Sequence, residues 1–399
     1  MPAEPAAFYG DLHEYGPVVP VHLDGTVPAW LVIGYDVCNQ VLRDGLRFSR
    51  DLGLWGVTER GELPPDWPLA PHVTRMDNML YASGQEHVRL RGAFKAGLRK
   101  VGAHWRNTQI RIVADQLIDS FVDAGRADIV GQYAVPLPVA VLTRLFGFPL
   151  EEAEVLQRAV LTLLDGGEGA LAAHEELSQT ISMHVHRRRR EPRTDMVTGL
   201  LEAGLTEEET IKTLWLSINA GIGATTAWTA NACVLLARAE DVRIDLRGSL
   251  RDIPSVMERV LWDHTPVQQV IGRIATTDVD LHGTLVRRGD LLILSLAGAN
   301  LDPRFGGADA RTSNTNGNGS HLAWGNGAHE CPAPDLAKAI VEIGVGRAWT
   351  RLDDIELTDP SQRIRWRDSI IVRMPEELNV SWDPARARTR AKTLAPIGE

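Results

Sequence analysis

The chain has 399 residues, 44% of them hydrophobic, which is enough for a large buried core, and it has no apolar run long enough to span a membrane. Its formal net charge of −10 argues against a nucleic-acid-binding protein. The three cysteines (Cys38, Cys233 and Cys331) are too few and too scattered for a disulfide framework, which predicts a cytoplasmic protein.

The first hundred residues predict both strands and helices. Residues 29–33 have the pattern of a strand, and the segment after Tyr35 has that of a short helix. Residues 53–83 are rich in Gly, Pro and polar residues, and we expect a long loop that is either a lid or disordered. Residues 86–102 are basic and helical.

Helical patterns dominate from residue 110 to residue 201, with breaks near Gly131, Phe148 and Gly166. The run HRRRR at residues 186–190 stands alone and lacks interleaved aromatic residues. We therefore interpret it as a solvated helix end and not as a nucleic-acid site.

The longest helical signal covers residues 205–240. Thr206 and Glu209 have the spacing of a capping box. The apolar residues that follow surround the helix on all sides, which predicts a helix through the middle of a domain. Poor helix formers near its centre are Gly221, Gly223, Thr225 and Thr226. They favour either a ligand pressed against the backbone or close helix–helix packing.

The last part of the chain predicts a helix after residue 255 and then β-like segments at residues 269–283 and 284–300. A tract rich in Gly, Asn, Asp and Ser leads into HLAWGNGAHECPA, residues 321–333, and a new helix follows at once. No internal repeat and no clear linker is present. The sequence therefore predicts a single domain over residues 1–399, mainly α with a smaller β part.

Cys331 follows a loop that contains two glycines and directly precedes a helix. One Cys and one His are too few for a structural zinc site. A nucleophilic cysteine and an inert core cysteine are both possible. However, glycines let backbone N–H groups turn toward the sulfur, and a helix N-terminus stabilises a thiolate. A thiolate held in this way, beneath a helix with glycines at its centre, is an arrangement that binds a haem iron.

The segment from Trp324 to Ala333 resembles the cysteine signature of the cytochrome P450 haem-thiolate monooxygenases. Trp324 replaces the usual Phe and Ala333 the usual second Gly, while the rest of the pattern matches. Similar motifs extend across nearly the whole chain. They are His87 and Arg91 (His-x-x-x-Arg), Thr225 and Thr226 on the central helix, Pro266 to Gln268 with Arg273, Asn300 to Phe305, and His321.

The resemblance implies the cytochrome P450 fold and a haem b cofactor whose iron is bound by the Cys331 thiolate. It implies cofactor-binding roles for His87, Arg91, Gly221, Arg273, His321, Trp324, Gly325, His329 and Cys331. Of these, two histidines and two arginines would neutralise the buried haem propionates. It also implies Thr225 and Thr226 as catalytic residues.

The function implied is monooxygenation of a small organic molecule, polyketide- or terpene-like, with O2 and two electrons from a ferredoxin and its ferredoxin reductase. We expect a monomer that uses neither a membrane nor a nucleic acid. The basic side chains that would face an acidic ferredoxin are Arg89, Lys95, Arg99 and Lys100.

Two departures from the family pattern are informative. Arg259 and Trp262 stand where the family has a Glu-x-x-Arg ion pair, so that pair cannot form. We expect Trp262 to be buried and Arg259 to face solvent or a surface acid, because an unpaired buried charge is costly. Glu258 lies one residue away, about 100° round the helix, where it could restore one bond.

The second departure is Ala224, which stands where the family usually places an acid before Thr225. The acid and the threonine normally relay protons to the bound oxygen. A relay rebuilt elsewhere is one explanation. The alternatives are a weak or leaky oxygenase, a peroxide-dependent oxygenase, and a catalytically silent haem protein that acts as a partner or scaffold.

Overall fold

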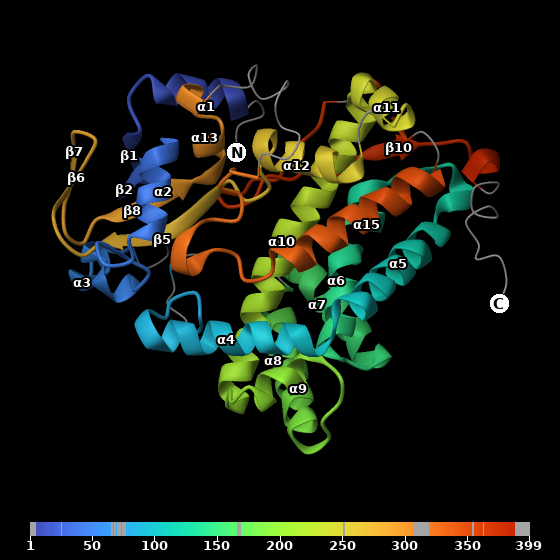
Figure 1. Ribbon diagram of the computed structural model, residues 1–399, viewed down its shortest axis with the longest axis horizontal. Helices are drawn as coiled ribbons and strands as arrows, with labels where there is room; N and C mark the ends of the chain where they lie inside the picture. Colours follow the sequence, from blue (N-terminus) through green and yellow to red (C-terminus); the bar gives the residue numbers. More distant parts are fainter. Residues whose placement is uncertain are drawn as a thin grey trace. The chain divides into compact units, whose positions relative to one another are not determined.

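The computed structural model of the chain describes residues 5–387, apart from residues 25, 65–66, 68, 70–72, 74–76, 166–168, 250–251, 306–318, 353–354 and 362 (Figure 1). The chain forms two compact units. The first comprises residues 1–91, 258–332 and 367–373, and the second comprises residues 92–257, 333–366 and 374–399. That residues 1–399 form one domain stays a prediction.

The first unit is built around a mixed β-sheet. Among the described residues this sheet has five strands in the order β1-β2-β8-β5-β3, with β2 and β8 parallel and the other neighbours antiparallel. The strands are β1 (Val18–Leu23), β2 (Val27–Val32), β3 (Phe48–Ser49), β5 (Gln269–Ala275) and β8 (Leu291–Ser295), and β6 (Val279–Leu281) and β7 (Thr284–Val286) form a separate hairpin. The helical segments are α1 (Pro5–His13), α2 (Tyr35–Arg43), η1 (Leu52–Leu54), α3 (Gly56–Glu59), α13 (Leu296–Asn300), η5 (Pro303–Phe305) and η6 (Gly327–His329), with parts of α4 (Gly84–Lys100) and α12 (Ile253–Asp263).

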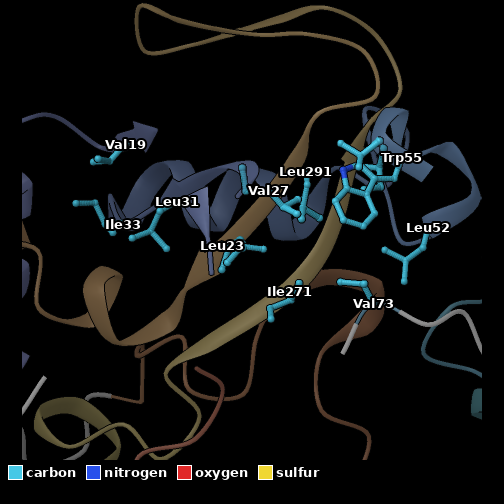
Figure 2. Close-up of a cluster of buried hydrophobic side chains, with 14 of the residues drawn as sticks. Val19, Leu23, Val27, Leu31, Ile33, Leu52, Trp55, Val73, Ile271 and Leu291 are labelled. Carbon is cyan, nitrogen blue, oxygen red and sulfur yellow. The ribbon is translucent and has the colours of Figure 1, made fainter. Parts of the chain in front are cut away.

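Strand β8 is buried on both faces of the sheet. Leu291 and Ile293 belong to one apolar cluster, whereas Leu292 and Leu294 belong to another. This division follows from the alternation of side chains along a strand. Figure 2 shows the first cluster, in which Trp55 lies next to Leu291. Burial on both faces explains why the sequence LLIL is apolar throughout.

The second unit is mainly helical. Its helices are α5 (Ala103–Asp119), α6 (Pro136–Phe146), α7 (Leu150–Asp165), α8 (Ala170–Arg190), α9 (Met196–Glu202), α10 (Glu207–Arg238), α11 (Glu240–Arg247) and α15 (Pro334–Leu352), with the short 3₁₀-helix η3 (Val122–Ala124) and the short π-helix η4 (Val130–Ala134). Its strands β4 (Arg126–Asp128), β10 (Asn379–Ser381) and β9 (Glu356–Leu357) pair in that order. The fold is mainly α with a smaller β part, as the sequence predicted.

Helix α10 is the long central helix that the sequence predicted, and its capping box is confirmed. The Glu209 N–H donates to Thr206 Oγ1 (3.1 Å), and the Thr206 N–H donates to Glu209 Oε2 (2.9 Å). The helix packs against α6, α8 and α15 (Figure 1). It is long and apolar enough to cross a membrane, but 72% of its most apolar stretch is buried inside the protein. That burial is typical of a core helix.

The expectation of a solvated helix end at residues 186–190 is wrong for Arg188. This side chain is 4% exposed and forms an ion pair with Asp195. Arg188 also donates a hydrogen bond to the Gly147 carbonyl oxygen. The charge can be buried because a carboxylate and a carbonyl satisfy it, and the sequence did not indicate this tertiary pairing.

Two further expectations need correction. The β-like segment at residues 284–300 ends in a helix, because Leu296–Asn300 form α13 and the Ser295 hydroxyl caps it by accepting from the Gly298 N–H (3.0 Å). The predicted long loop at residues 53–83 contains the short helix α3 among its described residues. Both elements are too short to produce a clear periodic signal.

Candidate active site

The loop that carries Cys331 turns tightly at two glycines. Gly325 and Gly327 have φ values of +70° and +72°, in the region that glycine adopts without a steric penalty. The Gly325 N–H donates to the Leu322 carbonyl (2.7 Å), and the Cys331 N–H donates to the Trp324 carbonyl (2.8 Å). The Cys331 side chain stays partly exposed and takes part in no disulfide among the described residues. The loop therefore presents a sulfur on a fixed backbone.

The tip of this loop is held against α2. Asn326 Nδ2 donates to Asn39 Oδ1 (2.6 Å). A Cβ atom on Gly327 would lie 2.8 Å from the Leu42 carbonyl oxygen, so a larger residue would not fit there. Gly327 is thus required both by its φ value and by a close backbone approach.

Side chains from α4 lie beside the cysteine loop. The rings of His87 and His329 pack with centroids 4.3 Å apart. Arg91 Nη2 lies 3.5 Å from the Cys331 carbonyl oxygen. His87 and Arg91 are four residues apart and share one helix face. The structure thus brings together four of the predicted site residues, although no contact shows what they bind.

Arg273 lies at a β-bulge in β5. The register of β5 with β8 shifts between Ile271 and Arg273, and Gly272 has a φ of +95°. Bulges of this kind re-aim the neighbouring side chain. Arg273 is 2% exposed, its Nη1 and Nη2 lie 3.4 and 3.5 Å from backbone carbonyls, and its Nε has no hydrogen-bond partner. Buried polar atoms normally have close partners, so this guanidinium has donors available for a ligand.

Arg50 is a buried cation that the sequence analysis missed. It is 4% exposed, and it donates to the Ile271 carbonyl (2.8 Å) and the Leu80 carbonyl (3.3 Å). A Cβ atom on Gly272 would lie 3.8 Å from Arg50 Nη1, so Arg50 lies beside the same bulge. An arginine that follows a two-residue strand gives no signal of burial in the sequence.

We call Arg50, Arg91 and Arg273 the cation cluster, and the rings of His87 and His329 lie beside it. Burial, with Arg50 as a second cause, lowers the pKa of Arg273 to about 9, and burial lowers that of Arg50 to about 10. Burial and then the neighbouring cations, first Arg273, lower the pKa of His329 to about 3. Burial, Arg91 and Arg273 lower the pKa of His87.

No aspartate or glutamate among the described residues forms an ion pair with any member of the cation cluster. Each buried cation therefore costs desolvation energy and repels its neighbours. A ligand with two carboxylates would relieve both costs, and guanidinium groups bind carboxylates in charge-assisted hydrogen bonds. The propionates of haem, next to a cysteine thiolate for its iron, fit this donor set.

The predicted residues of α10 belong to the second unit. A Cβ atom on Gly221 would lie 3.2 Å from Leu142 Cδ1 of α6, which supports close helix packing as one reason for this glycine. Thr225 is buried, and the Thr226 hydroxyl is buried with no hydrogen-bond partner among the described residues. The roles of Gly221 toward a cofactor and of the threonines in catalysis stay predictions.

The positions of the missing Glu-x-x-Arg pair lie on α12. Trp262 is buried, at 6% exposure, as predicted. Arg259 Nε lies 3.4 Å from Asp263 Oδ2, and both side chains are about one-fifth exposed, in agreement with the expected contact with an acid near the surface. His321 Nε2 lies 2.9 Å from Glu258 Oε1. The predicted role of His321 as a propionate ligand stays a prediction.

Relatives in the cytochrome P450 family match nearly the whole length of the chain. Cytochrome P450 105C1 of a Streptomyces species is 31% identical over 366 residues, which cover 89% of each chain. The 2-hydroxy-5-methyl-1-naphthoate 7-hydroxylase of Streptomyces carzinostaticus is 30% identical over 400 residues, covering 96% of this chain and 95% of the relative. The polyketide biosynthesis cytochrome P450 PksS of Bacillus subtilis is 28% identical over 365 residues, covering 89% of each.

Solved structures of cytochromes P450 superimpose on nearly the whole chain. The structure of PksS superimposes with a TM-score of 0.83 at 28% identity, over 96% of this chain and 97% of that one. A steroid-bound CYP154C4 from a Streptomyces species has a TM-score of 0.86 at 24% identity, over 95% and 96% of the two chains, and shows the shared fold. No family model matches the chain. The identity of the chain to these sequence relatives shows that it belongs to the cytochrome P450 family of oxidoreductases.

Proposed function

We propose that the protein binds haem b through Cys331 and inserts one oxygen atom of O2 into a small organic molecule. The observation that carries this proposal is the cation cluster, a set of buried and half-buried arginines without carboxylate partners among the described residues, beside the loop that presents the Cys331 sulfur. When bound, a haem would supply the iron that activates O2, and a thiolate ligand would raise the electron density of that iron.

The chain's own residues would hold the cofactor and move protons. Arg50, Arg91 and Arg273 would donate hydrogen bonds to the propionates. His87 would join them as an N–H donor, and His329 would pack against it. The glycine loop would direct backbone N–H groups toward the Cys331 sulfur and reduce its charge. Thr225 and Thr226 would hold a water or a substrate hydroxyl that delivers protons.

The relatives suggest the substrate class. PksS is named for polyketide biosynthesis, and the Streptomyces carzinostaticus relative is named as a naphthoate hydroxylase. We propose that the substrate of this protein is a small organic molecule, polyketide- or terpene-like. We place the protein in the cytoplasm, where its two buried thiols, Cys38 and Cys233, stay reduced.

We further propose that the electrons come from a ferredoxin and its reductase. Helix α4 carries a series of cationic side chains, Arg89, Lys95, Arg99 and Lys100. Two of these already contact acids, since Arg89 pairs with Glu86 and Lys100 with Glu202. Such a surface favours association with an acidic protein through complementary charge.

The test uses the haem-loaded protein reduced under carbon monoxide. A thiolate ligand gives the red-shifted Soret band that marks this class of haem protein, and Cys331→Ser should abolish it, whereas Cys38→Ser and Cys233→Ser should keep it. Substrates that shift the Soret band are then incubated with 18O2 and an electron source. Product that carries 18O supports the proposal. A red-shifted band that survives Cys331→Ser, or product without 18O, would contradict it.

A second candidate is a weak or peroxide-dependent oxygenase, or a silent haem protein that acts as a partner. It is favoured by Ala224, which gives Thr225 no acidic neighbour in sequence. A positioned acid contributes roughly 10²–10⁴-fold to a proton-transfer step. If the relay is incomplete, Ala224→Glu should raise the fraction of electrons that end in product. If the wild type couples electrons to product efficiently and Ala224→Glu changes nothing, this candidate is excluded.

A further inference from the structure

Helix α12 contacts the start of the cysteine loop through a pair of side chains that replaces the missing ion pair. The His321 side chain is 1% exposed, and its Nε2 lies 2.9 Å from the Glu258 carboxylate oxygen. The Trp262 ring meets the same imidazole edge-on, with centroids 5.7 Å apart and planes at 81°. Glu258 and Trp262 are four residues apart, so they share one face of α12 and both point to His321.

The next loop residue, Leu322, is connected to the same helix by hydrogen bonds through Asn300. The Leu322 N–H donates to Asn300 Oδ1 (2.8 Å). The Asn300 amide in turn donates to the Leu261 carbonyl and to the Thr265 hydroxyl, both at 3.1 Å. All of these groups are buried, so the contacts are shielded from water. The start of the loop therefore makes a close contact with α12 at His321, and at Leu322 it is hydrogen-bonded to α12 through Asn300.

The attachment continues to the cysteine through the backbone. The Leu322 carbonyl accepts from the Gly325 N–H (2.7 Å), and the Trp324 carbonyl accepts from the Cys331 N–H (2.8 Å). A shift of His321 and Leu322 would thus move the turn that fixes the backbone of Cys331. Groups that bind a metal must be held within about 0.5 Å of their working geometry.

We infer that Glu258 and His321 form a positioning pair that fixes the geometry of the Cys331 loop, in place of the ion pair that Arg259 and Trp262 cannot make. The inference rests on the proposed function, since the loop is taken to present the axial ligand. The sequence indicated only that Glu258 could restore one bond, and the inference names His321 as its partner. His321 is then a positioning residue, whether or not it also contacts the cofactor.

The experiment compares haem-loaded wild type with Glu258→Gln, His321→Gln and the double variant. Each single variant should convert part of the reduced carbon monoxide complex from the red-shifted thiolate band to a shorter-wavelength band. The double variant should be no worse than the singles, with a coupling of about tenfold in the ratio of the two bands, since the residues act as one unit. Additive effects, or wild-type spectra in both single variants, would overturn the inference.

Two controls separate positioning from simple stability. Glu62→Gln makes the same change in an exposed ion pair of the first unit and should leave the band ratio unchanged. Asp195→Asn destabilises the second unit and should lower the unfolding midpoint without changing the ratio; a parallel change in the ratio would overturn the inference. The same double-mutant cycle is repeated on urea unfolding of the haem-free protein. If the wild type lacks a thiolate band, the proposed function fails. The unfolding cycle then still tests whether Glu258 and His321 act together. Coupled losses of unfolding free energy support the pair, and additive losses refute it.

Discussion

Two groups of arginines, one in each unit, are stabilised in different ways. In the second unit the buried Arg188 pairs with Asp195, and the buried Arg351 pairs with Asp115 and Asp119. In the first unit, the members of the cation cluster have no carboxylate partner among the described residues. A charge with a partner inside the chain serves the fold, whereas a group of buried cations without one is suited to an anion from outside. The predictions below test this contrast.

The largest effect is expected from breaking a compensated pair. Asp195→Asn leaves Arg188 buried without its counter-charge, and Asp195 also caps α9 by accepting from the Thr198 N–H. Removing one partner of a buried pair costs about 3–5 kcal/mol of folding free energy. Urea denaturation measures this loss. Replacing both partners, as in Arg188→Met with Asp195→Leu, should restore part of the lost folding free energy. A loss below about 1 kcal/mol in Asp195→Asn would show that this ion pair does not stabilise the fold.

Trp262 shows the apolar alternative to an ion pair in the first unit. Trp262→Ala should cost about 3–5 kcal/mol, because it opens a cavity beside His321. Arg259→Ala should cost under about 1 kcal/mol, because its contact with Asp263 is long and partly exposed. Thermal or urea unfolding of the two variants checks both values. Similar losses would show that Arg259 supports a buried network.

Arg273 should matter more for haem than for folding. Arg273→Met removes a buried cation whose desolvation has no carboxylate to offset it, so the haem-free protein should be as stable as the wild type or more stable. Haem affinity should fall about 10- to 100-fold, since a hydrogen bond to a charged group contributes about 1.5–3 kcal/mol. Urea unfolding and haem transfer to apomyoglobin measure the two effects. A large loss of stability with unchanged haem affinity would show that Arg273 supports the fold and does not bind haem.

His184 in the second unit should make stability pH-dependent. Its ring is fully buried, donates from Nε2 to the Phe146 carbonyl oxygen (3.0 Å) and stacks on Phe148, and burial lowers its pKa to about 4. The unfolded chain binds a proton below about pH 6.5 while the folded one does not, so stability is complete above that pH and falls toward pH 4. Between pH 7 and pH 5 the wild type should lose about 2 kcal/mol more than His184→Gln. Equal slopes in urea titrations would show that His184 is protonated in the fold.

Much of the fold could be predicted because it depends on local pattern. The capping box at Thr206 and the apolar length of α10 are encoded within one helix, and the strand at Val27–Val32 has a clear β pattern. The helix α13 and the burial of Arg188 were missed. A five-residue helix has no period to detect, and the partner of Arg188 is recognisable only once the chain is folded.

The candidate site was predictable only where a motif carries it. His87, Arg91, His329 and Cys331 come together in the structure as their motifs suggested. Arg50 and the contact of Glu258 with His321 were not predicted, because they depend on the bulge at Gly272 and on the side of α12 that faces the loop. Tertiary juxtapositions of this kind leave no spacing signature in the sequence.

The most direct test of the account is the affinity of the protein for haem compared with haem dimethyl ester, in which both propionates are neutral. The ester keeps the iron and the ring, so it can still take the Cys331 thiolate, but it removes the anions that the cation cluster is proposed to bind. We predict that haem binds at least about 100-fold more tightly than the ester, because the ester cannot form the charge-assisted hydrogen bonds. We also predict that Arg273→Met lowers the ratio of the two affinities, haem over ester. Equal affinity for the two compounds in the wild type would contradict the central claim.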